Sequence, residues 1–477
     1  MSKQPSLLFV LDRTNRASLQ TQLALNLKRL VHTGVLRPGK AVPSTRELAH
    51  ELQISRNTAI QAYDRLIGEG YLEASARRGL YVSELLAGKN LNKPPSPDMP
   101  GPVTVHFEGD VSESVNAPVP FRPCQPDVRL FPLRLWNRAR AQALRRHGTS
   151  LLQYQSHQPL GLPALRRSLA GYLQASRGVR CDWRQIAITT GSQQALFLLA
   201  HLLLKPGDAV AMEDPGYPGA LSAWRHIRAE IYPVQVDSAG MKLDTHKDLS
   251  PKLVYTTPSR QFPIGSCLSL PRRLELVEFA ARKKAWIVED DYDSEFRYSR
   301  APLPSLHSLD SSQRVIYVGS TSKALFPSLR IGYAVLPIAL LEKFAKLRAA
   351  VDEHGPWIDQ GTLAEFIESG AFYIHIRRSR REYALRLEMF LESAAKYELP
   401  VSFPYTDGGM NLAGFLGGAA RDAECSRRLK EKGLDVPALS QYSLRAASPG
   451  LLFGFTAFEP NTIRKSVQLA SGVLRGR

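Results

Sequence analysis

The chain has 477 residues, of which 44% are hydrophobic and 22% are charged, and its formal net charge is +18. This length is too great for one hydrophobic core and predicts two or three domains with the composition of a soluble globular protein. The basic excess favours a polyanionic partner. Four widely separated cysteines lack metal-ligand spacing, and no apolar run reaches the ~18 residues of a membrane span. We therefore expect a cytoplasmic protein without a metal site or a membrane segment.

Residues 1–84 predict three short helices followed by two strands. Leucines repeat at helical spacing within 18–31, and Ser44 and Glu47 have the spacing of a capping box at the start of a second helix. Ser55 is placed to cap a third helix, and two short strands then enclose the cationic segment Ala-Arg-Arg-Gly, 76–79. This order predicts a winged helix-turn-helix, whose third helix would enter the major groove of double-stranded DNA by its N-terminus.

Polar and cationic side chains gather where this domain would face DNA. They lie at the starts of the second and third helices and at the tip of the wing: Ser44, Arg46, Ser55, Arg56, Asn57, Thr58, Arg77, Arg78 and Gly79. The hydroxyls of Ser44, Ser55 and Thr58 are candidate donors to phosphates. Residues 1–84 hold 12 basic and 7 acidic residues, so much of the net charge lies elsewhere. A helix-turn-helix that contacts another protein is the alternative interpretation.

The composition changes after residue 84. Residues 85–117 are rich in proline and polar residues and predict an extended linker, with a short strand at 103–107. From Pro118 onward strands and helices alternate, which predicts an α/β domain over 118–477 with a mainly parallel sheet and helices on both faces. In such a domain a ligand binds at the carboxyl ends of the strands.

Lys323 follows the β-branched strand 315–318 in the turn Gly-Ser-Thr-Ser-Lys. A lysine at the mouth of a parallel sheet is well placed to form a Schiff base with an aldehyde. Ser320, Ser322 and Arg330 add the hydroxyl donors and the forked cation that a phosphate needs. Together these residues suggest pyridoxal phosphate.

Three other strands end in residues that suit the same cofactor. Strand 286–289 leads to Asp290, which could keep the pyridine nitrogen protonated, and to Tyr292, whose phenol could bond to O3′. A Gly-Ser turn at Gly191 opens a helix and offers N–H groups to an anion. Tyr217 follows another strand and could lie flat against the ring.

Several motifs resemble a known family. They are Pro-Ser-Thr-Arg-Glu-Leu-Ala at 43–49, Ser-Arg-Asn-Thr at 55–58, Thr-Pro-Ser-Arg-Gln-Phe-Pro at 257–263, Glu-Asp-Asp-Tyr-Asp-Ser-Glu-Phe at 289–296 and Ser-Thr-Ser-Lys at 320–323. Residues 12–84 resemble the winged helix-turn-helix of GntR-family regulators, and 118–477 resemble a fold-type I aminotransferase. This order is typical of MocR-type regulators, which include the GABA-responsive and pyridoxine-synthesis regulators.

The resemblance implies a role for each candidate cofactor residue. Lys323 would bind pyridoxal phosphate covalently, with Asp290 at the pyridine nitrogen and Tyr292 at O3′. The phosphate would be held by Ser192, Gln193, Ser320, Ser322 and Arg330, and the ring would stack on Tyr217. Tyr154 would reach the phosphate of the partner subunit in a homodimer.

The chain departs from the family pattern where an amino-acid ligand is bound. The two arginines that hold a ligand carboxylate in the GABA-responsive type are replaced by Ala457 and Gly219, and two usual histidines by Arg260 and Asn411. We therefore expect a DNA-binding transcriptional regulator, associated with the nucleoid, that senses pyridoxal phosphate or an amino-acid-type effector. An active aminotransferase with an accessory DNA-binding domain is the alternative.

Overall fold

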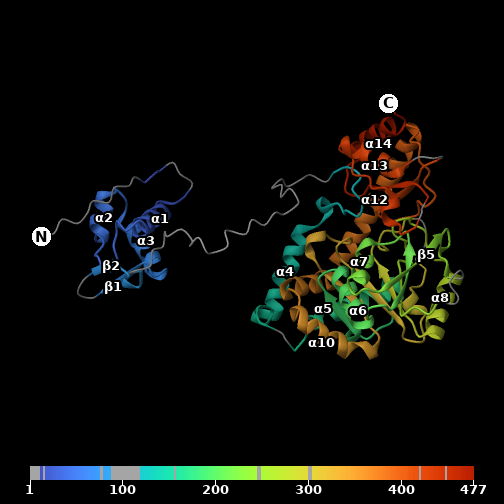
Figure 1. Cartoon of the computed structure of the whole chain (residues 1–477), viewed down its shortest axis with the longest axis horizontal. Coiled ribbons are helices and arrows are strands. Elements are labelled where there is room, and N and C mark those ends of the chain that lie inside the picture. Colours follow the sequence, from blue (N-terminus) through green and yellow to red (C-terminus); the bar gives the residue numbers. More distant parts are fainter. Residues whose placement is uncertain are drawn as a thin grey trace. The chain divides into compact units, whose positions relative to one another are not determined.

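The structure is a computed structural model that describes residues 11–13, 17–75, 79–86, 119–154, 157–243, 249–298, 303–417, 421–445 and 448–476. The chain divides into two compact units, one containing the described residues up to 86 and the other those from 119 onward (Figure 1). The predicted domain boundaries at 84 and 118 stay predictions. Nearly all of the predicted linker, including the strand expected at 103–107, lies outside the described residues.

The first unit is the predicted winged helix-turn-helix. Its elements are α1 (Leu19–His32), α2 (Thr45–Glu51), α3 (Arg56–Gly68), β1 (Leu72–Ser75) and β2 (Gly79–Val82). Leucines and alanines at helical spacing on α1 and α3 form its core, which includes Leu23, Leu27 and Leu66. The Tyr63 hydroxyl donates a 2.8 Å hydrogen bond to the Pro43 carbonyl and so ties α3 to the start of α2.

The second unit is built on an eight-stranded sheet with the order β3-β10-β9-β8-β7-β4-β5-β6. The strands are β3 (Ile186–Thr189), β4 (Ala209–Asp214), β5 (Glu230–Asp237), β6 (Gly240–Met241), β7 (Leu253–Thr256), β8 (Trp286–Asp291), β9 (Val315–Ser320) and β10 (Gly332–Val335). The pairings from β5 through β4, β7 and β8 to β9 are parallel. Strand β10 is antiparallel to both of its neighbours. The predicted α/β fold with a mainly parallel sheet is therefore confirmed.

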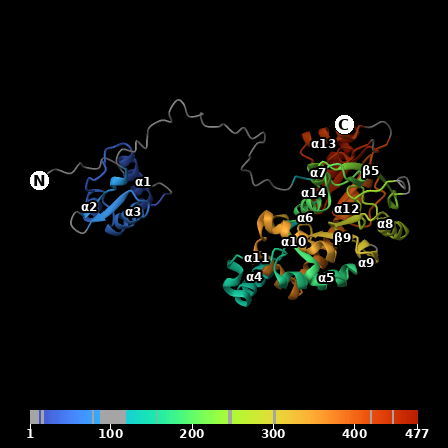
Figure 2. The same cartoon turned by 60° about the horizontal axis from the view of Figure 1, so that its bottom comes forward.

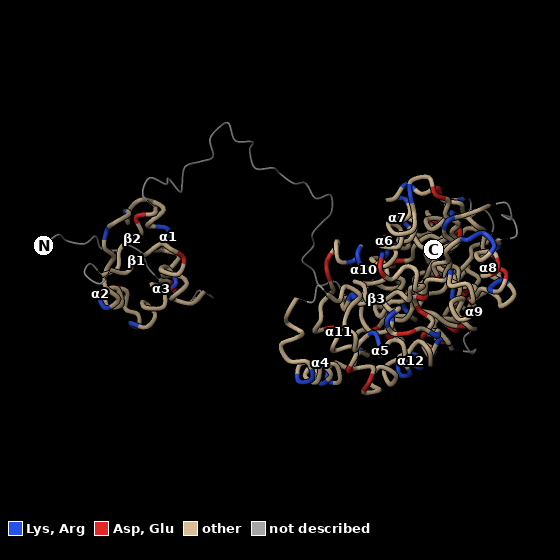
Figure 3. The backbone as a smooth tube through the Cα atoms, turned by 90° about the horizontal axis from the view of Figure 1, so that it is seen from below, with Lys and Arg blue, Asp and Glu red and all other residues tan. Residues whose placement is uncertain are grey.

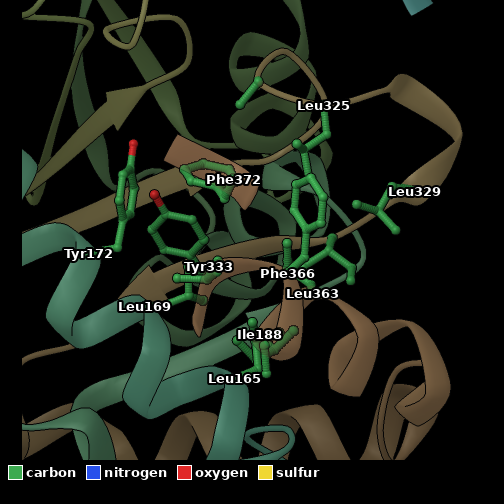
Figure 4. Close-up of a cluster of buried hydrophobic side chains, with 14 of the residues drawn as sticks. Leu165, Leu169, Tyr172, Ile188, Leu325, Leu329, Tyr333, Leu363, Phe366 and Phe372 are labelled. Carbon is green, nitrogen blue, oxygen red and sulfur yellow. The ribbon is translucent and has the colours of Figure 1, made fainter. Parts of the chain in front are cut away.

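Helices cover both faces of this sheet. They are α4 (Leu133–His147), α5 (Pro163–Arg177), α6 (Ser192–Leu203), α7 (Pro218–His226), α8 (Leu270–Lys283), α9 (Leu306–Leu309), α10 (Leu341–Asp352), α11 (Trp357–Glu368) and α12 (Ala371–Lys396). Side chains alternate along each strand, so Ile188 packs with α4, α5 and α11 (Figure 4) and its neighbour Ala187 packs with α6 and α10. Figure 2 shows α4 and α5 on one side of the unit and α6 and α7 toward the other.

Helix α12 leads to a smaller C-terminal part of the same unit. This part contains β11 (Asn411–Phe415), α13 (Asp422–Glu431), β12 (Gly450–Gly454) and α14 (Pro460–Leu474). Its aromatic and aliphatic core includes Phe121, which belongs to the first described stretch after the predicted linker.

Short 3-10 helices of the two units occur at Glu84–Leu86, Val128–Leu130, Gly148–Leu152, Trp183–Gln185, Pro327–Leu329, Ile338–Leu340 and Leu439–Tyr442.

Candidate functional site

A cavity of about 190 Å³ lies beyond the carboxyl ends of the parallel strands, and nine of the ten predicted cofactor residues line it. These nine are Ser192, Gln193, Tyr217, Asp290, Tyr292, Ser320, Ser322, Lys323 and Arg330. The sequence analysis missed four other lining residues, which are Cys124, Tyr255, Thr257 and Phe262. Thr257 and Phe262 fall within one of the quoted motifs, whereas nothing in the sequence around Cys124 pointed to the cavity.

Lys323 lies in the turn that leaves β9. The turn is fixed at Thr321, whose backbone N–H and hydroxyl both donate to the Ile331 carbonyl, at 3.0 and 2.7 Å. The Lys323 side chain is half-buried, and its amine donates a 2.7 Å hydrogen bond to the Cys124 carbonyl. The amine therefore stands in the cavity wall, close to the first described residues that follow the predicted linker.

Asp290, on β8, is buried in the wall of the cavity. One carboxylate oxygen accepts a 2.8 Å hydrogen bond from the Tyr255 hydroxyl, and the other has no hydrogen-bond partner among the described residues. Burial raises the pKa of Asp290 to about 7; the Tyr255 hydrogen bond opposes the rise, and Asp291 and Glu213 add to it. A protonated pyridine nitrogen would supply both the missing donor and a countercharge. The carboxylate therefore fits the group predicted for it.

The predicted phosphate donors gather around the start of α6. Gly191 precedes this helix with φ of 84°, and no side chain caps the helix in the described structure. The Arg330 guanidinium donates a 2.9 Å hydrogen bond to the Thr190 carbonyl, and a Cβ at Gly191 would lie only 2.8 Å from its Nη2. The buried Ser322 hydroxyl has no partner among the described residues. N–H groups, hydroxyls and one guanidinium thus face the same end of the cavity, as a phosphate requires.

Aromatic side chains form the walls of the cavity. The Tyr217 hydroxyl donates a long 3.4 Å hydrogen bond to Gln193, and its ring meets the ring of Phe262 edge to face at 5.7 Å. Phe262 has the same relation to Tyr292 and to Tyr442, at 5.9 and 5.3 Å. Burial raises the pKa of Tyr217 to about 12 and raises that of Tyr292 as well, so both remain neutral phenols that can donate a hydrogen bond.

The described lining of the cavity has few charges. Among its lining residues, Asp290 alone has a carboxyl group, and Lys323 and Arg330 are the two strong bases. Position 219 has no room for an arginine without a rearrangement, because a Cβ at Gly219 would lie 2.3 Å from Gln193 Oε1 and 2.6 Å from the Tyr217 ring. The described lining therefore has no cation for a ligand carboxylate beyond Lys323 and Arg330, which are already assigned to the cofactor.

The C-terminal segment supplies no cation either, although not for the reason that the sequence suggested. Ala457 packs in the cluster around Phe121 and does not line the cavity. The residue of β12 that packs in the small cluster containing Phe262 and Cys124 is Leu452, which is fully buried. The position next to the cavity wall is therefore apolar.

Arg260 is committed to neighbours outside the cavity lining. Its guanidinium is buried, lies 3.5 Å from Asp293 and donates to the Asn411 carbonyl. Gly409 leaves space for it, because a Cβ there would lie 2.0 Å from Arg260 Nε. Asn411 in turn accepts a 2.6 Å hydrogen bond from the Cys124 N–H. Arg260 thus holds the Asn411 backbone, the Asn411 side chain holds the Cys124 segment, and neither residue lines the cavity.

Tyr154 is the one predicted cofactor residue that does not line this cavity. Its side chain is 86% exposed, and within its own chain its ring lies near His354, with 6.4 Å between ring centroids. This position leaves the assignment of Tyr154 to a partner subunit as a prediction.

The predicted DNA-contacting residues lie mainly at two helix starts. Arg46, Arg56 and Asn57 are exposed at the first turns of α2 and α3, and Gly79 is exposed at the start of β2. Arg77 and Arg78 lie outside the described residues. The exposed cation Arg56 at the start of α3 agrees with a helix that meets DNA by its N-terminus.

The predicted phosphate donors in this unit serve as helix caps. The Ser44 hydroxyl accepts from the Glu47 N–H at 3.2 Å, and Glu47 accepts from the Ser44 N–H at 2.8 Å, so the predicted capping box is present. The Ser55 hydroxyl accepts from the Thr58 N–H at 3.1 Å and lies 2.8 Å from the Thr58 hydroxyl. Their use toward phosphates stays a prediction.

No helix in the described ranges is long and apolar enough to cross a membrane. No group of three or more His, Cys, Asp or Glu side chains arranged to hold a metal ion occurs in the part of the chain that the structure describes.

Comparisons with known proteins agree with both units. Residues 19–82 match the family described as bacterial regulatory proteins, gntR family, and 129–451 match aminotransferase class I and II. The chain is 34% identical to the probable rhizopine catabolism regulatory protein MocR of Rhizobium meliloti, over 96% of this chain and 94% of that protein. It is 33% identical to the pyridoxine biosynthesis transcriptional regulator PdxR of Corynebacterium glutamicum, over 94% of each.

Solved aminotransferases share the fold of the second unit. The kynurenine aminotransferase of Pyrococcus horikoshii is similar with a TM-score of 0.70 and 28% identity, covering 75% of this chain and 91% of that chain. Both families are thus matched in this order, and the named regulators are matched over nearly their whole length. The chain belongs to the MocR-type regulators of the GntR family, in which a helix-turn-helix domain precedes an aminotransferase-like domain.

Proposed function

We propose that the protein is a transcriptional regulator that binds double-stranded DNA through its first unit and pyridoxal phosphate through its second. We further propose that pyridoxal phosphate itself, rather than an amino acid, is the signal. The observation that carries this choice is the composition of the cavity, whose described lining contains one carboxyl group, Asp290, and two strong bases, Lys323 and Arg330. Its site of action would be the cytoplasm, on the nucleoid.

The nine lining residues suit this cofactor one by one. When bound, it supplies an aldehyde that an amine can attack and a ring that withdraws electrons. Lys323 provides the amine, Asp290 would hold the proton on the pyridine nitrogen, and Tyr292 would donate to O3′. The donors at the start of α6 and Arg330 would neutralise the phosphate.

An amino-acid effector would find a poorer site. Its carboxylate loses water on entering the cavity and needs a cation or several N–H donors to offset that loss. Arg330 lies among the proposed phosphate donors, and Arg260 lies beside Asp293. Position 219 is a glycine, and a side chain there would require Gln193 and Tyr217 to move. The same lack argues against efficient transamination, because an enzyme must fix the α-carboxylate of its substrate to orient the reacting bond.

An active aminotransferase remains the second candidate function, because the complete set of cofactor-binding side chains is what such an enzyme requires. Incubation with pyridoxal phosphate, a panel of amino acids and 2-oxoglutarate would test it. We expect turnover far below the typical enzymatic range of ~1–10³ s⁻¹. Turnover within that range would favour the enzyme.

Operator binding tests the proposed signal. DNA fragments occupied by the protein in its host would be recovered and bound to apo-protein, to protein with pyridoxal phosphate, and to the latter with amino acids added. A ligand shifts the DNA-binding equilibrium only by its differential affinity for the two states. We expect the cofactor alone to change the affinity or the bending of the DNA, and Lys323→Ala to show no change. If only an added amino acid alters binding, the proposed signal is wrong.

We propose that the functional form is a homodimer. Tyr154 is exposed and does not reach the cavity of its own chain, and the nearby Leu152 and Leu144 are 66% and 38% exposed. Apolar side chains exposed together are typical of a subunit interface. Sedimentation of the purified protein would test this, with Leu152→Lys as the variant expected to weaken the dimer.

A further inference from the structure

Most of the net positive charge of this protein lies in residues 118–477, outside the predicted DNA-binding domain. Residues 118–477 hold 48 of the 62 basic residues and 33 of the 44 acidic residues, an excess of 15 positive charges. The cofactor cavity uses only Lys323 and Arg330. Most of the excess therefore lies on the surface of the aminotransferase-like unit, where it can attract a polyanion.

Four arginines form a continuous exposed surface on α12. They are Arg377, Arg378, Arg380 and Arg381, and we call them the α12 arginine surface. The helix buries Ile376, Ser379 and Tyr383 against the domain, so the arginines between them face solvent. Within the described ranges, Arg377, Arg378 and Arg381 have no carboxylate within 4.0 Å. Figure 3 shows basic segments beside α5 and α12 along one margin of this unit.

A concave site adjoins this surface. A cavity of about 200 Å³ between α5 and α12 has Tyr172, Arg177, Glu295, Arg377 and Arg380 among its lining residues. The Arg177 side chain is 8% exposed and lies 3.0 Å from Asp291 and 3.7 Å from Glu295, yet its Nη2 has no hydrogen-bond acceptor in the described structure. Arg380 is fixed by a 2.9 Å hydrogen bond from its Nε to the Glu295 carbonyl, which leaves its terminal nitrogens available.

The charge balance of the cavity favours an anion despite the carboxylate in its lining. The lining holds three guanidinium groups and the Glu295 carboxylate, which already accepts a 2.7 Å hydrogen bond from the Tyr172 hydroxyl. Asp291 pairs with Arg177 from outside the lining, so the uncompensated positive charge comes from Arg377 and Arg380. Every cation here is an arginine, whose planar fork matches two phosphate oxygens better than a lysine does. Arg377 and Arg381 are separated by about 6 Å along the helix, which is on the order of two phosphate spacings at ~3.4 Å per strand.

We propose that the α12 arginine surface and the adjoining cavity bind the sugar–phosphate backbone of DNA, as a second contact that reads no bases. The inference rests on the proposed function, because the first unit would select the site and this surface would hold flanking DNA. The segment between Leu86 and Val119 reaches at most about 120 Å when fully extended, since each residue adds at most ~3.3–3.6 Å. A duplex of ~60 base pairs is longer than this reach and can engage both units.

Salt dependence of DNA binding tests the proposal. Full-length protein loaded with pyridoxal phosphate would be titrated onto a random-sequence duplex of ~60 base pairs at several KCl concentrations. The test variant is Arg377→Gln/Arg378→Gln/Arg381→Gln. The matched control, Arg282→Gln/Lys283→Gln/Lys284→Gln, removes the same charge at the end of α8, which packs on α9 and β8. Melting curves and the cofactor absorption band would verify that all proteins are folded.

We expect the test variant to bind severalfold more weakly and to lower the slope of log K against log salt by up to ~2.7, because each phosphate contact contributes about 0.9. The control should keep nearly the wild-type slope. An unchanged slope in the test variant, or equal losses in both variants, would overturn the proposal. Normal DNA binding by the test variant together with lost binding of an acidic protein would also overturn it.

The outcome can be separated from a failure of the proposed function. Arg46→Ala/Arg56→Ala should remove the preference for operator over random DNA while keeping most of the salt slope. The α12 variant should do the reverse. If the wild-type protein binds no DNA, the proposed function fails; if it binds DNA and the α12 variant matches it, only this inference fails.

Discussion

Lys323 can be removed with little effect on the fold. Its side chain is half-buried and makes one hydrogen bond, to Cys124, whose loss costs about 1 kcal/mol. We expect wild-type protein to be yellow, with an absorption band that borohydride abolishes, and Lys323→Ala to be colourless with an apo melting temperature within a few degrees of wild type. The exposed ion-pair lysine Lys346, changed to alanine, is the control. A normal band in Lys323→Ala would refute the assignment.

Asp290 should make the stability of apo-protein depend on pH. Burial raises its pKa from the usual 3.8 to about 7, so the folded state favours the protonated carboxyl. That contribution is complete below about pH 4 and is lost as the pH rises through about 7. The apo melting temperature should therefore fall more steeply between pH 4 and 8 in wild type than in Asp290→Asn. Parallel curves for the two proteins would contradict this account.

At the start of α3, the helix cap and the expected DNA contact belong to two different residues, Ser55 and Arg56, so substitutions can test them separately. Ser55→Asp keeps an oxygen that accepts from the Thr58 N–H, so stability should hold, but its charge should repel phosphates and weaken DNA binding. Ser55→Ala should instead cost about 1 kcal/mol of stability.

Arg56→Ala should cost about 1–3 kcal/mol of specific binding if it reads a base, with Arg65→Ala at the far end of α3 as the control. Equal binding by Arg56→Ala and wild type would contradict the expected role of α3.

The local elements could be predicted from sequence better than their pairing. Strands 286–289 and 315–318 were predicted within the observed β8 and β9, because short apolar runs that end in turn residues define them. Strand β10 was not predicted, and it follows a turn in which Arg330 lies in the left-handed region. Its insertion between β3 and β9, antiparallel to both, depends on contacts between distant segments that no local pattern encodes.

The candidate site shows the same limit. Lys323, Asp290 and Tyr217 were predictable because each follows a strand and carries distinctive chemistry. Cys124 was not, since it comes from a segment far away in sequence and reaches the cavity through hydrogen bonds to Lys323 and Asn411. Tyr255 was missed because it lies inside strand β7, where the sequence pattern indicates a core residue. Only the structure shows that its hydroxyl donates a hydrogen bond to Asp290.

The whole molecule should unfold in two steps. The two units have separate hydrophobic cores, one around Leu23 and Tyr63 and the others within 119–476. A ligand that binds one folded unit stabilises it by ~2.7 kcal/mol at a concentration 100 times its Kd. In calorimetry, pyridoxal phosphate should raise one transition and DNA mainly the other, which Ser55→Ala identifies by lowering it. A single transition that both ligands raise equally would contradict this independence.

The hydrogen bond between Lys323 and the Cys124 carbonyl couples ligand binding in the cavity to the stretch 119–127, which follows the predicted linker. The amine that donates this bond is the one an aldehyde would occupy, so the stretch 119–127 loses a donor when the cavity is loaded. By reciprocity, any pull on that stretch which breaks the bond would alter the affinity for the aldehyde by the same free energy. Hydrogen exchange of 119–127 should therefore differ between apo and loaded protein, and the difference should vanish in Lys323→Ala.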